Sequence, residues 1–367
     1  MTRPGYPWDI VEGALPAVAR STRVETVEYA HARDASLFRP FLLYVRQAAR
    51  AIASHARVER VAVIHAATNF QNALPALLAA RRLGVPFQYE MRGLWELTRA
   101  SRWPGYERSG HCAFGLACEG MVVRHADKVF AISALLQQDA EARWGVSASR
   151  FALLPNCVDP ARFEPADAAA VVPKRIGYAG SLMGYEGLDT LIEAVARLVG
   201  RGCRVELEIM GDGEARTALE ALVQARAVGD HVRLLGKVPP EVARERLAAC
   251  ALVCIPRKPF EVCRLVPPIK LVEALAMGKP VIVPDLPLFR EELGPEPAGW
   301  FFRPGDVDDL ARVIETALSD PDRAQRLGRL GRDYAIAQRS WRRYVPLLVD
   351  SESPASVGLR CGRVGLG

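Results

Sequence analysis

Val266-Pro-Pro-Ile-Lys-Leu-Val-Glu-Ala-Leu-Ala-Met-Gly-Lys-Pro-Val-Ile-Val-Pro284 is the stretch of this chain that says most about its fold. The two prolines near its start preset the first turn of a short helix, where the missing backbone N–H is no loss. Lys270 and Glu273 fall three residues apart on one face of that helix. Gly278 ends the helix, and the apolar run that follows predicts a buried strand.

The start of this helix is a candidate phosphate site. The unpaired N–H groups of a helix start carry partial positive charge, and Lys270 adds a full charge beside them. Glu273, one turn deeper, can accept hydrogen bonds from ribose hydroxyls. The pattern therefore suits a nucleoside diphosphate.

Short apolar runs alternate with segments of helical length along the chain, which is typical of βαβ units and a parallel sheet. Strands are expected at 61–67, 85–91, 128–133 and 151–155 in the first half, and at 175–181, 205–211, 231–236, 251–256 and 280–284 in the second. Helices are expected at 38–55 and 323–350. Two Rossmann-like domains are predicted, at residues 1–165 and 166–350, followed by a flexible tail at 351–367. In open sheets, ligands bind beyond the carboxyl ends of the strands, so a site in the cleft between the domains is expected.

The run from Lys270 to Pro280, read as K-L-V-E-A-L-A-M-G-K-P, resembles the signature of retaining GT-B glycosyltransferases of family four. The resemblance continues, in family order, at residues 127–133, 154–159, 176–189 and 209–213. It implies an α/β GT-B fold, with two Rossmann-like domains whose parallel sheets face a central cleft, and it implies that Glu273 holds the donor ribose. Similar proteins usually begin with a further strand, glycine-rich loop and helix, so the N-terminal domain of this chain is expected to be incomplete at its start.

The expected donor side lies in the second half. Backbone N–H groups of Gly180-Ser-Leu-Met-Gly184 can cradle phosphate oxygens. Many similar proteins carry an Arg and a Lys where this chain has Ser181 and Glu186, so the diphosphate charge needs another source. We predict that Arg257, Arg264 and Lys270 supply it. The residues expected to bind the donor are Gly180, Ser181, Glu186, Gly211, Gly213, Val238, Arg264 and Glu273. The usual Glu-x7-Glu pair is absent, because position 265 is Leu265.

The expected catalytic side lies in the first half, after the strand at 85–91. Glu90 and Arg92 stand at the end of that strand, beside a long loop that reaches Gly110. The aromatic and charged residues of the loop suit contact with a sugar or another acceptor, and a solvated surface loop is the alternative. His65 follows an apolar strand, where a structural histidine is common, but its position matches an Ile-His-Ala element at the cleft of similar proteins. With Arg257 and Lys270, these three residues are the candidates for catalysis.

The function expected from the resemblance is that of a retaining hexosyltransferase. It would move a sugar from a nucleotide-diphosphate sugar to a hydroxyl of a sugar, glycolipid or polysaccharide acceptor, in envelope polysaccharide or glycolipid synthesis. We expect no cofactor, and no metal, because Asp212 and Asp308-Asp309 have the contexts of a turn and a helix cap. The alternatives are a truncated, catalytically silent nucleotide-sugar-binding protein and a dinucleotide-dependent oxidoreductase, although no G-x-G-x-x-G follows the first expected strand.

Composition sets wider limits. The 367 residues are half apolar, which allows two large cores, and the eight cysteines lack C-x-x-C spacing and are expected to be reduced thiols. No signal peptide or membrane-spanning run is evident, so a cytoplasmic location is expected. The net charge of +6 suits phosphates, an anionic membrane or nucleic acid, and with the motifs above we expect no nucleic acid. The segment 38–55, with Arg46 and Arg50 among large apolar residues, is either a domain helix or a peripheral contact with anionic lipid.

Overall fold

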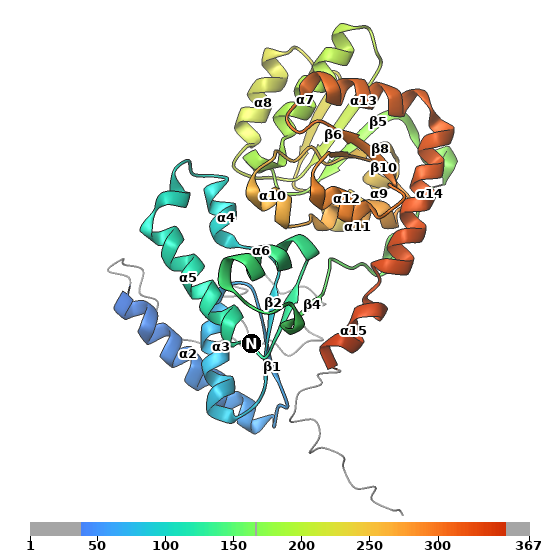
Figure 1. Ribbon diagram of the computed structural model, residues 1–367. Coiled ribbons are helices and arrows are strands. Elements are labelled where there is room, and N and C mark those ends of the chain that lie inside the picture. Colours follow the sequence, from blue (N-terminus) through green and yellow to red (C-terminus); the bar gives the residue numbers. More distant parts are fainter. Residues whose placement is uncertain (1–37, 166, 350–367) are drawn as a thin grey trace, which may run out of the picture. The chain divides into compact units, whose positions relative to one another are not determined.

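The computed structural model describes residues 38–165 and 167–349 (Figure 1). Within them the chain forms two compact units. One contains the residues up to Glu96 together with Tyr106–Leu153, and the other contains Leu97–Gly105 together with the chain from Leu154 onward. The sequence placed the domain boundary after residue 165, whereas the compact units change at Leu153–Leu154. The expected incomplete start and the expected tail at 351–367 lie outside the described residues.

The first unit is built on a four-stranded parallel sheet in the order β1-β2-β3-β4. Its strands are β1 (Ile64–Ala67), β2 (Phe87–Met91), β3 (Lys128–Ala131) and β4 (Phe151–Leu153). Its helices are α2 (Phe38–Val58), α3 (Phe70–Leu83), α5 (Gly110–His125) and α6 (Ala134–Trp144), with the 3-10 turn η2 (Ala148–Arg150). All four strands predicted for this half are confirmed, and α2 confirms the predicted helix at 38–55.

The segment after β2 differs from the prediction. In place of one long loop, the chain forms α4 (Trp95–Ala100) and the 3-10 turn η1 (Tyr106–Arg108). Glu96 in α4 is buried, and its carboxylate accepts a hydrogen bond from the hydroxyl of Tyr106. The hydrogen bond of the buried Glu96 orders the segment between α4 and η1. A helix of six residues is too short to give a periodic pattern in the sequence, so α4 was not predicted.

The second unit is built on a six-stranded parallel sheet in the order β10-β9-β8-β5-β6-β7. Its strands are β5 (Val172–Ala179), β6 (Glu206–Met210), β7 (Val232–Gly236), β8 (Cys250–Cys254), β9 (Val281–Pro284) and β10 (Gly299–Phe302). Its helices are α7 (Leu188–Gly200), α8 (Arg216–Ala225), α9 (Pro240–Ala248), α10 (Glu261–Leu265), α11 (Ile269–Ala276), α12 (Pro287–Leu293), α13 (Val307–Ser319), α14 (Pro321–Gln338) and α15 (Trp341–Val349), with 3-10 turns η3 (Pro160–Arg162), η4 (Ala168–Ala170) and η5 (Gly184–Glu186).

Two predictions for this unit are corrected. The short strand β10 was missed, and the single helix predicted at 323–350 is two helices, α14 and α15. The interruption falls at Arg339 and Ser340, where the backbone carbonyl of Arg339 accepts a hydrogen bond from the N–H of Val158 (2.9 Å) and Ser340 forms a parallel bridge with Val158. A contact with a distant segment therefore breaks a pattern that is locally helical.

The strand order of this sheet reverses direction at one point. The chain moves from β5 outward through β6 to β7, then returns to the other side of β5 and continues through β8, β9 and β10. The order reverses between β5 and β8, and the carboxyl ends of such neighbouring strands open a crevice where ligands bind in open α/β sheets.

Both faces of the six-stranded sheet are covered by helices (Figure 1). On one face, Ile176 and Tyr178 of β5 pack with Leu191 of α7 and Ile314 of α13. On the other, residues of α9, α11 and α12 pack on β9. The side chains of β5 alternate between the two faces, so Ile176 and Tyr178 belong to the first core and Ala179 packs against the second.

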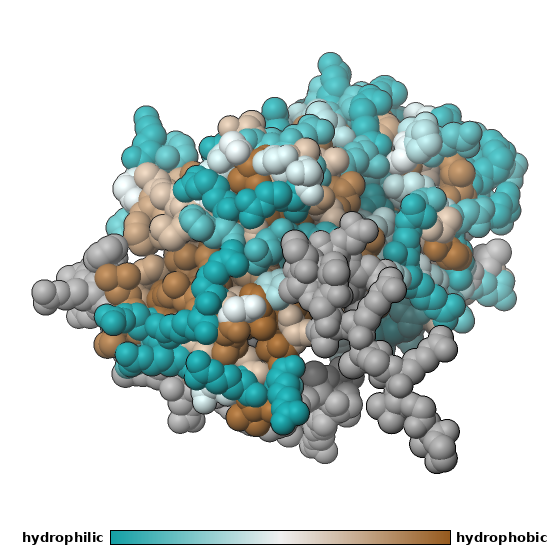
Figure 2. All heavy atoms as spheres, turned by 60° about the horizontal axis from the view of Figure 1, so that its bottom comes forward, coloured by the Kyte–Doolittle hydropathy of each residue, from teal (hydrophilic) through white to brown (hydrophobic). Residues whose placement is uncertain are grey.

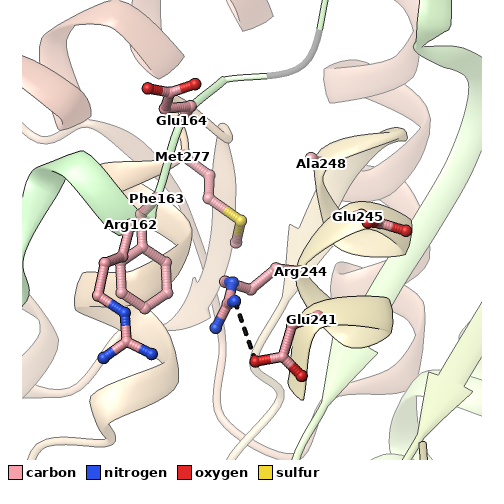
Figure 3. Close-up of a pocket in the computed structure, with 8 residues that line it drawn as sticks. All are labelled: Arg162, Phe163, Glu164, Glu241, Arg244, Glu245, Ala248 and Met277. Atoms are coloured by element: carbon pink, nitrogen blue, oxygen red, sulfur yellow. Dashed lines mark hydrogen bonds and ion pairs between the residues drawn. The ribbon is translucent and has the colours of Figure 1, made fainter. Parts of the chain in front are cut away.

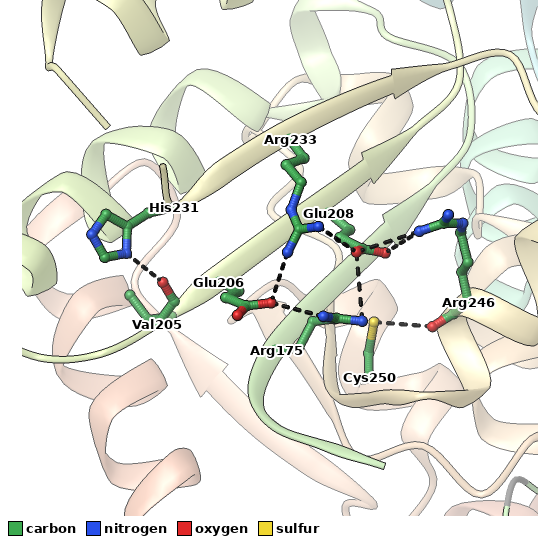
Figure 4. A network of polar contacts seen from close by, with 8 residues as sticks. All are labelled: Arg175, Val205, Glu206, Glu208, His231, Arg233, Arg246 and Cys250. Atoms are coloured by element: carbon green, nitrogen blue, oxygen red, sulfur yellow. Dashed lines mark hydrogen bonds and ion pairs between the residues drawn. The ribbon is translucent and has the colours of Figure 1, made fainter. Parts of the chain in front are cut away.

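A buried carboxylate also links the strands of this sheet (Figure 4). Glu208 on β6 is 1% exposed, and guanidinium nitrogens of Arg175, Arg233 and Arg246 lie 3.5, 4.0 and 3.3 Å from its oxygens. A buried charge is costly unless it is paired, and three cations compensate this one. The cluster lies at the middle of β6, two residues before the strand end that borders the crevice.

Close backbone contact joins two loops at the carboxyl edge of this sheet. The N–H of Gly180, after β5, donates to the carbonyl of Met210 (2.9 Å), and the N–H of Leu182 donates to that of Asp212 (3.0 Å). Gly211 has φ 138°, and a Cβ there would overlap the carbonyl oxygen of Gly180. Only glycine satisfies both requirements at this position.

Gly211→Ala should therefore lower the free energy of unfolding by about 2 kcal/mol or more, because it adds backbone strain and a steric overlap. Chemical denaturation measures this change. Gly200→Ala is the matched control, since Gly200 ends α7 with open space around it, and its effect should stay within about 1 kcal/mol. Equal effects of the two substitutions would contradict the close-contact argument.

Candidate functional site

Two loops of the second unit meet where the strand order reverses. The loop after β5 contains η5, and the loop after β8 contains Arg257 and Lys258. The N–H of Lys258 donates to the carbonyl of Tyr185 (3.0 Å), and a Cβ on Gly187, whose φ is 73°, would overlap the carbonyl oxygen of Pro256. Backbone contact therefore fixes one loop against the other.

Three charged side chains converge at this junction. Arg257 Nη2 donates to Glu186 Oε1 (2.9 Å), and Lys270 Nζ donates to Glu186 Oε2 (2.8 Å). Arg257 Nη1 also donates to the carbonyl of Val266 (2.8 Å). Glu186 comes from η5, Arg257 from the loop after β8 and Lys270 from the first turn of α11. The structure thus joins three residues that the sequence placed on the donor or catalytic side.

Tyr178 completes this cluster and was missed from the sequence. Its hydroxyl accepts a hydrogen bond from Lys270 Nζ (2.6 Å) and donates to the carbonyl of Ser181 (3.0 Å). Lys270 Nζ also lies 4.4 Å from the centre of the Tyr178 ring, in cation–π geometry. The side chain of Lys270 runs so close to Gly180 that a Cβ there would lie 2.8 Å from Nζ.

The charges of the cluster shift each other's pKa values. Burial opposes ionisation of Glu186, but the nearby Arg257 and Lys270 outweigh it and lower the pKa of this carboxyl to about 2. Burial lowers the pKa of the Lys270 ammonium to about 8, against the opposing attraction of Glu186. The cluster carries two cations and one anion, and its net positive charge suits an anionic ligand.

Glu273 lies one turn along α11 from Lys270. Burial raises the pKa of its carboxyl, although Arg244 and Lys270 act in the opposite direction. Within the described part of the chain this carboxylate forms no hydrogen bond or ion pair, in contrast to Glu186. A half-buried carboxylate that keeps its acceptors open fits the predicted contact with hydroxyl groups.

The other predicted donor residues take different positions. Gly213 packs against the backbone of Leu182, and Val238 packs on the core between β9 and α11. Ser181 is exposed, next to the cluster. Arg264 is exposed on α10 and is not among the residues that contact Glu186 in the described chain.

A pocket of ≈ 260 Å³ adjoins this region (Figure 3). Arg244 points into it, lies 3.4 Å from a carboxylate oxygen of Glu241 and 5.7 Å from the centre of the Phe163 ring, and its charge also reaches Glu273. None of the residues predicted from the sequence lines the pocket. It therefore neighbours the expected ribose position and not the cations at the strand ends.

The catalytic candidates of the first unit also lie together. Glu90 Oε2 is 3.3 Å from His65 Nε2, and Glu90 Oε1 is 3.6 Å from Arg92 Nε. The parallel register of β1 and β2 sets His65 opposite Gln88, whose Oε1 is 3.2 Å from His65 Nδ1. Thr68 accepts a hydrogen bond from the N–H of Arg92 (2.7 Å). Gln88 and Thr68 were not predicted from the sequence.

This arrangement raises the pKa of His65. Burial lowers the pKa of the imidazole, but hydrogen bonds to Glu90 and Gln88, together with the charge of Glu90, outweigh it, so the pKa lies above 6.5. When His65 is protonated, Glu90 lies between two cations, His65 and Arg92. His65 is the second residue of β1, and both of its ring nitrogens already face Gln88 and Glu90. The exposed Arg92, directly after β2, therefore carries the hydrogen-bond donors at the carboxyl end of that strand, where polar ligands of parallel sheets bind.

The sequence predicts no metal site, no disulfide and no membrane-spanning helix. Among the described residues, no group of three or more His, Cys, Asp or Glu side chains is placed to hold a metal ion, and metal independence stays a prediction. The seven cysteines in the described chain are free thiols, six of them buried. None of the helices in the described ranges is long and apolar enough to span a bilayer.

Comparisons with known proteins agree with this architecture. Residues 164–334 match the profile described as glycosyl transferases group 1, and residues 2–157 match the glycosyl transferase 4-like domain. Sucrose-phosphate synthase from Thermosynechococcus elongatus superposes with a TM-score of 0.69 at 21% identity, over 84% of this chain and 77% of that one. HepE from Anabaena in complex with UDP superposes with a TM-score of 0.68 at 17% identity, over 82% and 80%.

The fold and the two clusters define an α/β protein of the GT-B class, which confirms the predicted fold class. Along most of its length the chain carries two glycosyltransferase profiles in order, the 4-like domain in its first half and the group 1 profile in its second.

A curated relative also shows how far the likeness reaches. The phosphatidyl-myo-inositol mannosyltransferase of Mycolicibacterium smegmatis is 29% identical over 208 residues, which are 55% of this chain and 52% of that protein. The chain spans about half the length of such curated relatives.

The contacts of His65 lead to a test in solution. In the NMR titration of the His65 ring, the midpoint should lie above 6.5 in the unchanged protein and fall in Glu90→Gln, because burial then outweighs the remaining hydrogen bond. Since the folded-state pKa is raised, the stabilisation from this pair is present below pH 6.5 and is lost as pH rises through the folded-state pKa.

Arg92→Met is the control, because it leaves the contact between His65 and Glu90 in place, and it should not lower the midpoint. The assignment of Glu90 as the partner of His65 is wrong if Glu90→Gln titrates like the unchanged protein.

Proposed function

We propose that this protein is a retaining hexosyltransferase that moves a sugar from a nucleotide-diphosphate sugar to a hydroxyl of a sugar, glycolipid or polysaccharide acceptor. The observation that carries the proposal is the pair of cations, Arg257 and Lys270, at the strand-order reversal of the second unit. One turn from Lys270, Glu273 keeps its carboxylate open. Cations for a diphosphate and a carboxylate for a ribose thus share one helix start.

The residues have distinct proposed roles. Arg257 and Lys270 neutralise the diphosphate, and backbone N–H groups after Gly180 contribute to its binding. Glu273 accepts hydrogen bonds from the ribose hydroxyls. Arg92, which lies beside Glu90 and its partner His65, presents donors to the acceptor.

Retention needs no covalent bond to the protein in this proposal. The bond between the sugar's anomeric carbon and the phosphate oxygen breaks as the acceptor oxygen bonds to that carbon on the same face. The acceptor's hydroxyl proton passes to the leaving phosphate, which the cations stabilise as its charge grows. No metal or cofactor takes part in these steps, and transfer in the presence of a chelator tests this.

Known proteins support the donor class. HepE from Anabaena was crystallised with UDP and with UDP-glucose, and a protein from Streptomyces kanamyceticus that is 24% identical over 70% of this chain is a 2-deoxystreptamine glucosyltransferase. A silent nucleotide-sugar-binding protein is the main alternative, and it predicts binding of a donor without its turnover. A dinucleotide-dependent oxidoreductase predicts binding of a nicotinamide dinucleotide instead.

The surface of helix α2 suits contact with a membrane, through which a cytoplasmic protein could reach a lipid-linked acceptor. Its buried residues are small and apolar, and α2 packs on α3. The exposed face, which adjoins the buried one, carries Leu42 and Leu43 (43% and 55%) with Arg46, Arg50 and Arg57, and α2 has no acidic residue. Figure 2 turns this unit forward and shows apolar surface beside extended hydrophilic side chains. We propose peripheral contact between this face and an anionic membrane.

Two substitutions separate the parts of the donor site. Lys270→Met should weaken binding of UDP, GDP or ADP, whichever the protein binds, and leave the corresponding nucleoside unaffected, because it removes a phosphate contact. Glu273→Ala should weaken nucleoside and nucleoside diphosphate alike, by about 1–3 kcal/mol, because it removes ribose hydrogen bonds. Calorimetry with both ligands measures this. Each variant is the other's control, and identical losses in all four measurements would contradict the assigned roles.

Flotation with liposomes tests the membrane contact. The protein should float with anionic vesicles and much less with neutral ones, and salt should weaken the binding, because exposed arginines supply part of it. The triple substitution of Arg46, Arg50 and Arg57 to Gln should abolish the preference for anionic vesicles.

The matched control removes the same charge from exposed positions of the second unit, as Arg201, Arg326 and Arg329 to Gln. It should leave flotation unchanged. If both triple variants lose binding equally, net charge and not α2 determines the contact.

A further inference from the structure

We propose that Glu186 is a positioning residue, whose carboxylate holds Arg257 and Lys270 in the arrangement that binds the donor diphosphate without touching the donor itself. This inference rests on the proposed function, because it concerns the same diphosphate site. The inference goes beyond the proposed function because it assigns the arrangement of Arg257 and Lys270 to the buried Glu186.

Both carboxylate oxygens of Glu186 are already engaged. Oε1 accepts from Arg257 Nη2 at 2.9 Å, and Oε2 accepts from Lys270 Nζ at 2.8 Å and from Arg257 Nε at 3.3 Å. The residue is 3% exposed. A phosphate approaching this carboxylate would meet repulsion and no donor, so Glu186 acts on the ligand only through the cations.

The two cations keep donors for a ligand. The ammonium of Lys270 has three N–H donors, and those in contact with Tyr178 and Glu186 account for two. The guanidinium of Arg257 has five, of which three point to Glu186 and to the carbonyl of Val266. Because Glu186 and these neighbours fix the engaged donors, they also fix the directions of the remaining ones.

The backbone makes Glu186 a rigid support. It ends η5, and Gly187 follows with φ 73° in contact with the carbonyl of Pro256. The hydrogen bond from the N–H of Lys258 to the carbonyl of Tyr185 holds the same loop on the other side. The backbone that carries Glu186 is therefore held in place, so its carboxylate gives the two cations a fixed partner.

Glu186 also affects the protonation of Lys270. The titratable and charged groups that face Lys270 are Tyr178, Glu186, Arg257, Cys263 and, along its own helix, Glu273. Burial and Arg257 favour the neutral amine, whereas Glu186 makes the largest opposing contribution. Glu186 thus keeps Lys270 charged near neutral pH, as phosphate binding requires.

Glu186→Gln tests the proposal through pH. In the unchanged protein, affinity for the nucleoside diphosphate that it binds should fall as pH rises through about 8, when Lys270 loses its proton. In Glu186→Gln the midpoint should move down by about one pH unit or more, with affinity at least about twofold lower near neutral pH and recovering in acid. Affinity for the nucleoside should not change. Calorimetry from about pH 6 to about pH 9 gives both quantities.

A second variant separates position from charge. Glu186→Asp keeps the charge but withdraws the carboxylate by one methylene group, so it should keep the midpoint near that of the unchanged protein and lower diphosphate affinity severalfold. Asp189→Asn is the matched control: Asp189, in the first turn of α7, forms its ion pair with Lys258 at 2.6 Å and not with Arg257 or Lys270. It should change neither quantity.

The outcomes are distinct. If Glu186→Gln keeps the affinity and midpoint of the unchanged protein, or loses nucleoside and diphosphate binding equally with no shift of the midpoint, Glu186 is not a positioning residue. If the unchanged protein binds none of UDP, GDP and ADP, the proposed function fails and this inference fails with it. A shifted midpoint in Glu186→Gln and a retained midpoint in Glu186→Asp establish it.

Discussion

The ion cluster of Glu186, Arg257 and Lys270 is the interaction on which the architecture of the second unit depends. Three charges this far from water are tolerated only when each finds its partner, because an unpaired buried charge costs several kcal/mol. Their pairing requires that the loop after β5, the loop after β8 and the start of α11 lie next to one another. The strand order places the two loops side by side, and the close approach of Gly187 to the carbonyl of Pro256 lets them meet.

Much of the fold was readable from the sequence, because burial leaves a local signal. Each of the nine predicted strands is a short apolar run beside a turn or helix, and all nine are present. The exceptions depend on distant partners. The four residues of β10 are too short for a periodic signal, the break between α14 and α15 follows from pairing with Val158, and α4 is ordered around the buried Glu96.

The candidate sites were only partly predictable. Lys270, Arg257 and His65 were predictable because each has a polar side chain next to a predicted strand end or helix start, which the sequence alone shows. Tyr178 looked like an ordinary core residue of β5, and Gln88 like an ordinary strand residue, and no periodic pattern marks a hydroxyl or amide that contacts a charge across the sheet. Strand register supplies that information, because it sets Gln88 opposite His65.

The backbone contacts among the loops of the second unit limit how this protein can be re-engineered. The loop after β5 is bonded to the loop after β6 through Gly180 and Leu182, and to the loop after β8 through Tyr185. A loop grafted alone from a relative would lose the partners of its own main chain. The three loops therefore form one exchangeable block, and a change of donor preference is better sought by transplanting them together, or by altering side chains within the block, than by swapping any one of them.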